Sequence, residues 1–210
     1  MRMHYIVAVA CLAIAGVALA EEAVTPTEKT MLWNGKDLEG WKWSRPNSPK
    51  TWSVKDGVID CTGTPTGTLL TEKDYTSYKL HVEWRWADKP GNSGIFVHGV
   101  PYLIEIQLAN KRAGDLAAMR GADFKEHRDL VAAAGRERAI VPMQGKSVEK
   151  PSGEWNSADI VCRGDSIIVR INGELKNIAT ECNVQFGKIG LQSEGGRIQF
   201  RNIYIEPLDD

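Results

Sequence analysis

Charged, amide and imidazole side chains alternate with bulky apolar residues in three strand-like runs near the middle of the chain. These runs are 80–86, 94–98 and 102–108. Side chains alternate between the two faces of a strand, so Glu83 shares a face with Arg85, and Glu105 shares one with Gln107. We predict that the three runs build the polar face of one sheet. Acids and amides in this pattern favour recognition of a polar ligand, and a sugar is the leading choice.

Short runs of this kind recur along the chain and predict an all-β fold. They are separated by residues that tolerate positive φ, such as Asp56-Gly57, Asn172-Gly173 and Gly195-Gly196. Many short antiparallel strands joined by such turns favour a sandwich or jelly roll. We expect a single domain over 30–210, after a polar linker at 21–29.

The stretch from about 110 to 150 interrupts this rhythm. It is rich in Ala, Arg and Gly and has little period-two pattern, although a short helix is expected near 126–134. Loops of this length in compact domains are usually functional or disordered. We interpret the stretch as a loop excursion that forms a lid or a pocket wall.

The first twenty residues are typical of an export signal. Arg2 provides a positive start, 6–19 is nearly all apolar, and Ala18-Leu19-Ala20 has the small-x-small pattern of a cleavage site. The apolar run is too short for a membrane span, and nothing later in the chain approaches one. We therefore expect a secreted or periplasmic protein, cleaved near Ala20.

The charge balance excludes one class of ligand. Lys and Arg total 26, Asp and Glu total 27, and no basic tract occurs. Phosphate backbones are bound by clustered Lys and Arg, so we expect no nucleic-acid partner.

Three cysteines follow the signal, which is an odd number for a compartment that permits disulfides. Cys162 ends a strand-like run and Cys182 follows the next hairpin. We favour a Cys162–Cys182 disulfide, with Cys61 as a buried thiol.

Short segments in a fixed order span nearly the whole chain after the signal. They are LWNGKDLEGW at 32–41, Trp52 with DGVI at 56–59, GTLLT at 67–71, EWR at 83–85, NSGI at 92–95, EIQ at 105–107 with Gly114-Asp115, Trp155-Asn156, ING at 171–173, and GLQSE at 190–194 ahead of FRNI at 200–203. Together they resemble the secreted 3-keto-disaccharide hydrolase domain family, in the concanavalin A-like lectin and glucanase superfamily. The resemblance implies a jelly roll of two curved antiparallel sheets, with a sugar site on the concave one.

The resemblance also implies a chemistry. The substrate is a glycoside oxidised at C3, and the C3 ketone acidifies the C2 proton. A base removes that proton, the group at C1 leaves by elimination, and water adds back. Such a site needs a base near C2, a cation or donors at the enolate oxygen, and an acid at the leaving oxygen. A separate oxidoreductase must make the 3-keto sugar, because no glycine-rich nucleotide-binding motif occurs in this chain.

Three residues are candidates for catalysis. Glu105 is the first choice for a base or a metal ligand, because its apolar neighbours fix its strand, although a solvated outer-face carboxylate has the same pattern. His98 is a candidate acid or base that titrates near neutral pH, or else a structural histidine. Arg85 either stabilises the enolate or, together with Glu83, forms a salt-bridged support to a neighbouring strand.

Further polar residues of the matching segments are candidates for binding the substrate. They are Glu83, Asn92, Gln107, Asp115, Gln192 and Glu194. Turn formation is the competing interpretation for Asn92, Asp115 and Glu194. Glu105, Asp115 and Glu83 are also hard oxygen ligands that suit a divalent metal such as Ca²⁺.

Two alternatives to this enzyme remain open. One is a carbohydrate-binding module that uses the same face without turnover. The other is a conventional endo-glucanase, expected to carry two acids that bracket one or two residues on one strand. Glu105 and Gln107 supply only one acid there, but a second acid can come from another strand.

Overall fold

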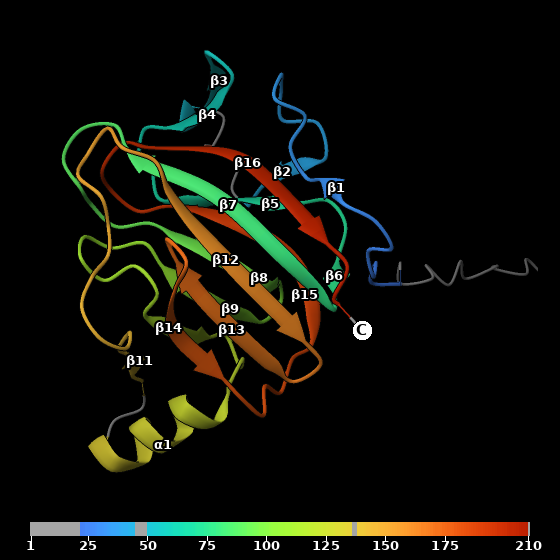
Figure 1. Ribbon diagram of the computed structural model, residues 1–210, viewed down its shortest axis with the longest axis vertical. Helices are drawn as coiled ribbons and strands as arrows, with labels where there is room; N and C mark the ends of the chain where they lie inside the picture. Colours follow the sequence, from blue (N-terminus) through green and yellow to red (C-terminus); the bar gives the residue numbers. More distant parts are fainter. Residues whose placement is uncertain (1–21, 45–49, 136–137, 210) are drawn as a thin grey trace, which may run out of the picture.

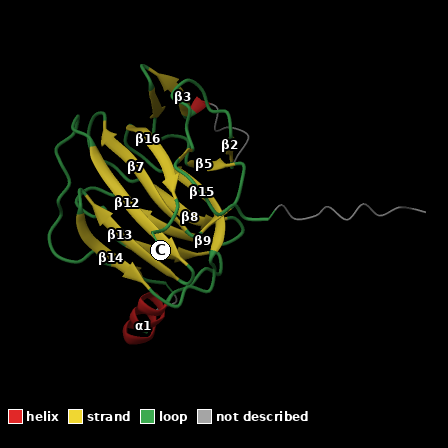
Figure 2. Ribbon diagram, turned by 45° about the vertical axis from the view of Figure 1, so that its right-hand side comes forward, coloured by secondary structure: helices red, strands yellow, loops and turns green. Residues whose placement is uncertain are grey.

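The computed structural model describes residues 22–44, 50–135 and 138–209, so the predicted export signal lies outside the described residues. Within these ranges the chain forms two antiparallel sheets packed face to face (Figure 1). A single α-helix lies at one end of the sheets in the described part of the chain (Figure 2). No helix in these ranges is long and apolar enough to cross a membrane.

The first sheet, which we call the β7 sheet, has the order β14-β13-β12-β7-β16-β4-β3, with β1 paired to β16. Its strands are β1 (Thr30–Met31), β3 (Trp52–Lys55), β4 (Val58–Cys61), β7 (Tyr78–Trp86), β12 (Asn156–Arg163), β13 (Ser166–Ile171), β14 (Glu174–Ala179) and β16 (Ile198–Glu206).

The second sheet, which we call the β9 sheet, has the order β11-β10-β9-β8-β15-β5-β2, with β6 paired to β15. Its strands are β2 (Trp41–Trp43), β5 (Gly67–Thr71), β6 (Tyr75–Thr76), β8 (Gly94–Gly99), β9 (Leu103–Gln107), β10 (Leu116–Met119), β11 (Ile140–Val141) and β15 (Phe186–Ser193).

The core lies between the two sheets and is filled by the apolar half of each alternating strand. In β7, Val82, Trp84 and Trp86 are at most 1% exposed, and the two indole rings meet edge to face with centroids 6.0 Å apart. Buried aromatic rings supply much of the apolar area of such a core. The expectation that both tryptophans of this strand face inward is confirmed.

The three polar runs do not share one sheet, so that prediction is wrong. The run at 80–86 lies in β7, whereas the other two form β8 and β9 of the opposite sheet. Period-two alternation fixes which face a side chain takes, but it carries no information about which strands pair. The polar halves of β7 and β9 therefore point away from the core on opposite sides of the molecule.

Two predicted hairpin turns are confirmed. Asn172 and Gly173 join β13 to β14 with φ of 50° and 83°, and Asp56 and Gly57 join β3 to β4 with φ of 52° and 70°. Two consecutive residues with positive φ match the right-handed twist of the strands that they connect.

The stretch at 110–150 is only partly an excursion. Its expected helix is α1 (Lys125–Ala134), but 116–119 forms β10, and 140–141 forms β11, so both belong to the β9 sheet. β10 was hidden in the sequence because small alanines stand on both of its faces and erase the polar alternation.

The favoured disulfide does not form. Cys61, Cys162 and Cys182 are buried free thiols. Cys162 lies opposite Tyr78 in the β7 sheet and packs in the core, where it acts as a small apolar side chain.

Candidate active site

Strand register places Glu105 in the middle of a row that crosses the β9 sheet from edge to edge. The row consists of Lys42, Leu70, Gly190, Phe96, Glu105, Ala117 and Ile140. Residues in register share a face, and Ile104 and Ile106 point into the core on either side of Glu105. The row therefore lies on the outer face of the β9 sheet.

Small residues next to Glu105 make room for its side chain. A Cβ atom on Gly94 would lie 2.2 Å from Glu105 Oε1, so only glycine leaves the carboxyl its place. Ala117 stands opposite Glu105 on β10, and Phe96, 3% exposed, stands opposite it on β8. Glu105 itself is 2% exposed, so its carboxyl sits in the floor of the sheet.

A pocket of about 630 Å³ opens above this floor. Its lining consists of Asn92, Glu105, Gln107, Ala117, Ala118, Met119, Arg138, Ala139, Ile140, Gln192 and Glu194. Three buried oxygen atoms of this lining have no hydrogen-bond partner, namely Glu105 Oε1, Asn92 Oδ1 and Gln192 Oε1. Buried oxygen atoms are normally paired, so three unpaired ones around one cavity indicate a binding site for a ligand that carries donors.

The electrostatics of the pocket centre on its two carboxyl groups. Burial raises the pKa of Glu105 to about 8, and the negative charge of Glu194 contributes to the rise. Glu194 lies at the exposed rim, where its Oε2 accepts a hydrogen bond of 2.8 Å from Asn92 Nδ2. Among the described residues that line the pocket, Arg138 is the one cation.

The structure thus brings Glu105 together with four of the predicted binding residues: Asn92, Gln107, Gln192 and Glu194. They come from β9, from β15 and from the segments next to β8 and β15, which are neighbours in the sheet. Their roles toward a substrate remain predictions.

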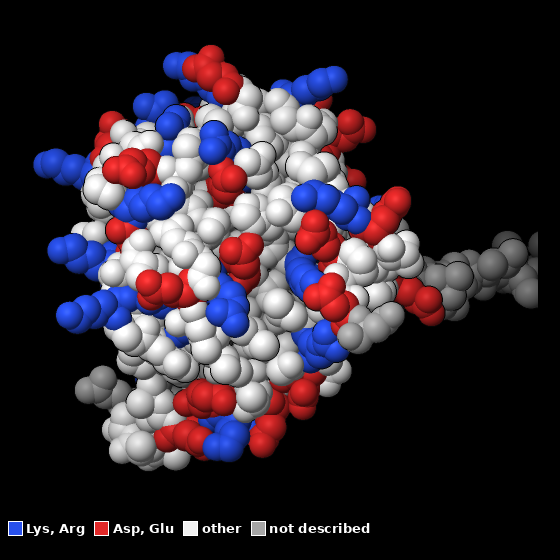
Figure 3. Space-filling model, viewed as in Figure 1, with Lys and Arg blue, Asp and Glu red and all other residues white. Residues whose placement is uncertain are grey.

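Glu83 and Arg85 lie on the outer face of the β7 sheet, across the core from the pocket. Glu83 accepts hydrogen bonds from Arg201 Nε at 2.6 Å and Asn202 Nδ2 at 2.9 Å, which hold its pKa below its usual value despite partial desolvation. Arg85 donates to Gln199 at 2.8 Å. Figure 3, which views this face, shows acidic and basic side chains interspersed without a large area of one sign. The two residues support the surface of their own sheet and do not reach Glu105.

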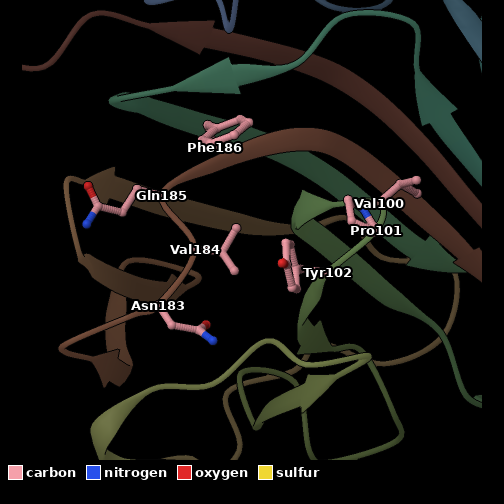
Figure 4. Close-up of a pocket in the computed structure, with 7 residues that line it drawn as sticks. All are labelled: Val100, Pro101, Tyr102, Asn183, Val184, Gln185 and Phe186. Atoms are coloured by element: carbon pink, nitrogen blue, oxygen red, sulfur yellow. The ribbon is translucent and has the colours of Figure 1, made fainter. Parts of the chain in front are cut away.

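His98 also lies outside the pocket. It is 1% exposed at the end of β8, and burial lowers its pKa to about 4. The expectation that it titrates near neutral pH is therefore wrong. The chain then turns at Val100–Tyr102 and, with segment 183–186, forms a second cavity of about 340 Å³ whose lining contains no charged residue (Figure 4).

Asp115 stabilises the stretch 112–143 through its own hydrogen bonds. It is 3% exposed, accepts from Arg112 Nε at 2.7 Å and from the Met143 backbone N–H at 2.8 Å, and does not line the pocket. Glu83, Glu105 and Asp115, which the sequence offers as possible ligands of a divalent metal, therefore do not lie together. Within the described ranges, no three His, Cys, Asp or Glu residues are placed to hold a metal ion.

Sequence reasoning missed Arg138 and the apolar wall beside it. Residues 117–119 and 138–140 line the pocket, so the expected wall is formed by β10 and by the segment that leads through β11. Nothing in the sequence separates Arg138 from the other basic residues of the stretch. The sequence indicates the position of Arg138 only indirectly, because the whole stretch at 110–150 is expected to form a lid or a pocket wall.

Glu105→Gln should change how the stability of the protein depends on pH. Glu105 has a usual pKa near 4.5 when unfolded and about 8 when folded, so between these values the folded state keeps a proton that the unfolded chain has lost. Stability of the wild-type protein therefore falls as pH rises through this window, by at most about 1.4 kcal/mol per pH unit from this group. Glu105→Gln has no titrating carboxyl at this position, so its stability should not fall with pH in this way.

Denaturant unfolding at pH 5, 6, 7 and 8 measures the effect. The free energy of unfolding of Glu105→Gln, relative to that of the wild type, should increase with each step in pH. For Glu206→Gln, on the opposite sheet, the difference from the wild type should be smaller and should change less with pH. A Glu105→Gln difference that is the same at pH 5 and pH 8 would show that the carboxyl titrates normally.

Comparison with known proteins agrees with this architecture. A curated 3-keto-disaccharide hydrolase of Bacteroides thetaiotaomicron is 24% identical over 234 residues, which cover 85% of this chain and 78% of that protein. A crystal structure of a candidate glycosyl hydrolase from Parabacteroides distasonis superposes with a TM-score of 0.64 at 25% identity, covering 87% of this chain and 94% of the other.

The fold extends to more distant proteins. A β-glucanase of Bacillus licheniformis gives a TM-score of 0.54 at 15% identity, over 81% of this chain and 94% of that chain, which confirms the predicted concanavalin-like jelly roll.

A family model described as the 3-keto-alpha-glucoside-1,2-lyase-like domain matches residues 28–206. The chain belongs to this 3-keto-alpha-glucoside-1,2-lyase-like family.

Proposed function

We propose that this protein is an enzyme that cleaves the glycosidic bond of 3-keto-disaccharides at the pocket above Glu105. The observation that carries the proposal is the set of three unpaired buried oxygen atoms, on Glu105, Asn92 and Gln192, around one cavity. Sugar hydroxyls are donors that would satisfy these oxygens. The similarity to a 3-keto-disaccharide hydrolase supports the same class of substrate.

The chemistry that fits the pocket is elimination assisted by the C3 carbonyl, followed by addition of water. Removal of the C2 proton produces an enolate, whose negative charge must be stabilised by a cation or by hydrogen-bond donors. Arg138 is the lining cation able to do this. Glu105 supplies a proton-transfer group with a pKa of about 8. This value suits catalysis, because groups that titrate near the working pH transfer protons best.

One observation favours a second candidate function. Glu194 brings a second carboxylate into the pocket from another strand end, as the alternative of a conventional glucanase requires. Such an enzyme would cleave glycosides that have not been oxidised, through two carboxyl groups that flank the bond. The substrate panel below separates the two.

The proposed substrate requires an earlier oxidation. A glycoside acquires a C3 carbonyl only by losing two electrons and two protons, and we propose that a separate oxidoreductase performs this step. Both proteins would act after export, once the segment up to Ala20 has been removed from this chain.

Glu105→Gln should strongly slow the cleavage of 3-keto-disaccharides. Loss of one acid-base group costs roughly 100-fold to 10,000-fold in rate, and glutamine keeps the shape of the side chain without its proton transfer. The assay measures sugar release from 3-keto-disaccharides and from their parent sugars, with and without a chelator. The wild type should cleave the keto sugars alone.

Cleavage of the parent sugars would favour the conventional glucanase. Saturable binding without turnover of any sugar would identify a carbohydrate-binding module. Loss of activity with chelator would indicate a required metal ion. Glu206→Gln, whose side chain pairs with Lys29 at the surface of the β7 sheet, serves as the matched control and should keep full activity.

Arg138→Ala should lower kcat more than it raises KM, because the cation is needed most when the enolate forms. Removal of one group that stabilises a developing oxyanion costs about 100-fold to 1,000-fold in kcat. Arg138→Lys should restore part of the loss, and steady-state kinetics on a 3-keto-disaccharide measure both variants. An effect confined to KM would reduce Arg138 to a binding residue.

A further inference from the structure

The two carboxyl groups of the pocket have opposite surroundings. Glu105 is 2% exposed, its Oε1 has no partner, and it forms no ion pair in the described part of the chain. Its cross-strand neighbours in the sheet are Phe96 and Ala117, both apolar and both buried. A carboxyl group buried without a cation or a donor is most stable in the protonated, uncharged form.

Glu194 instead has polar, solvent-facing surroundings. It lies at the exposed rim just after β15, and its Oε2 accepts the hydrogen bond of 2.8 Å from Asn92 Nδ2. A donor that points at a carboxylate oxygen fixes the position of the side chain, and the solvent-facing rim leaves its other oxygen open to a substrate. The donor is itself fixed, because the Asn92 backbone N–H donates to the Gly195 carbonyl at 2.9 Å.

The segment that carries Asn92 and the segment that carries Glu194 pack closely against each other at glycines. A Cβ atom on Gly91 would lie 2.1 Å from the Gly195 carbonyl oxygen, and one on Gly196 would lie 2.9 Å from Gly91 Cα. Any side chain at Gly91 would therefore separate the segments that carry Asn92 and Glu194. This close backbone contact fixes the two segments that bring Asn92 and Glu194 to the pocket.

We propose that Glu194 is the base that removes the C2 proton and that Glu105 is the acid that protonates the leaving oxygen. This assignment rests on the proposed function and divides its proton transfers between two residues. It reverses the expectation from the sequence that Glu105 is the base. One buried and one solvent-facing carboxyl group in a single site are a common basis for dividing acid and base roles.

The proton count closes over the cycle. The Glu194 carboxylate takes the proton from C2, and the electron pair of the C2–H bond becomes the enolate at C3. The enolate then re-forms its carbonyl, the C1–O bond breaks with formation of a C1–C2 double bond, and the leaving oxygen takes the proton of Glu105. Addition of water reverses both transfers, because Glu105 accepts a proton from water at C1 and Glu194 returns its proton to C2. The products are the 3-keto monosaccharide and the released sugar.

Other groups near the pocket do not compete for these roles. Arg138 is the remaining charged residue among the described lining, and a guanidinium does not give up its proton in proteins. His98, on the adjacent strand β8, is outside the lining and stays neutral around pH 7, since burial lowers its pKa to about 4. The pKa of about 8 for Glu105 agrees with a proton held at neutral pH.

The test compares two substrates and one exchange reaction in Glu105→Gln and Glu194→Gln. The first substrate is a 3-keto-disaccharide, whose sugar leaving group needs a proton. The second is a 3-keto nitrophenyl glucoside, whose leaving group departs as an anion. Exchange of the C2 proton in deuterated water, followed by NMR, reports the base alone.

Glu105→Gln should lose roughly 100-fold or more on the disaccharide, lose less than about 10-fold on the nitrophenyl glucoside, and retain C2 exchange. Glu194→Gln should lose cleavage of both substrates and C2 exchange together. Asn92→Ala, which loosens Glu194 without touching Glu105, should slow exchange and both cleavages in parallel. Glu206→Gln should match the wild type throughout.

Loss of C2 exchange in Glu105→Gln, or its retention in Glu194→Gln, would overturn the assignment while leaving the proposed function in place. A wild-type protein that neither exchanges the C2 proton nor cleaves either keto substrate would overturn the proposed function and the assignment with it. Circular dichroism and thermal unfolding of each variant establish that losses come from chemistry and not from misfolding.

Discussion

The organisation of this molecule around its pocket depends on one carboxyl group that is buried without a partner. Placing Glu105 in the floor of the β9 sheet requires glycine at 94, where any Cβ atom would occupy the position of Oε1, and a small residue at Ala117 on the neighbouring strand. Burial then keeps the proton on the group and raises its pKa to about 8. Sequence, packing and acid-base chemistry meet at this position, because the two small residues that admit the side chain carry no side-chain donor to pair with it.

Similar polar side chains stand on the outer faces of the two sheets, but they differ in whether they have hydrogen-bond partners. On the β7 sheet every acid of the strand surface has partners, as Glu83 shows with Arg201 and Asn202. On the β9 sheet the oxygens of Glu105, Asn92 and Gln192 are left without partners around one cavity. Unpaired buried oxygens cost folding free energy, of the order of 1–3 kcal/mol each, so a ligand that supplies donors recovers part of that cost on binding. Three such oxygens therefore surround one cavity on the β9 sheet.

Much of the fold could be predicted from local patterns. Alternation identified the inward tryptophans of β7, and the Asn172-Gly173 turn identified a hairpin, because both depend on near neighbours in the chain. Sheet membership could not be predicted, since strand pairing is set by contacts far apart in sequence, and so Arg85 and Glu83 were placed beside Glu105 in error. Arg138 and the role of Glu194 depend on the same long-range contacts, which bring the stretch before β11 and the end of β15 to one cavity.

The most direct test of this account is the titration of the Glu105 carboxyl carbon by NMR, in protein labelled with ¹³C at glutamate side chains. The resonance is assigned by its absence in Glu105→Gln. The account predicts a midpoint near pH 8 that moves to lower pH in Glu194→Gln, because the neighbouring negative charge is removed. A midpoint near the ordinary value of 4.5, unchanged by Glu194→Gln, would contradict it.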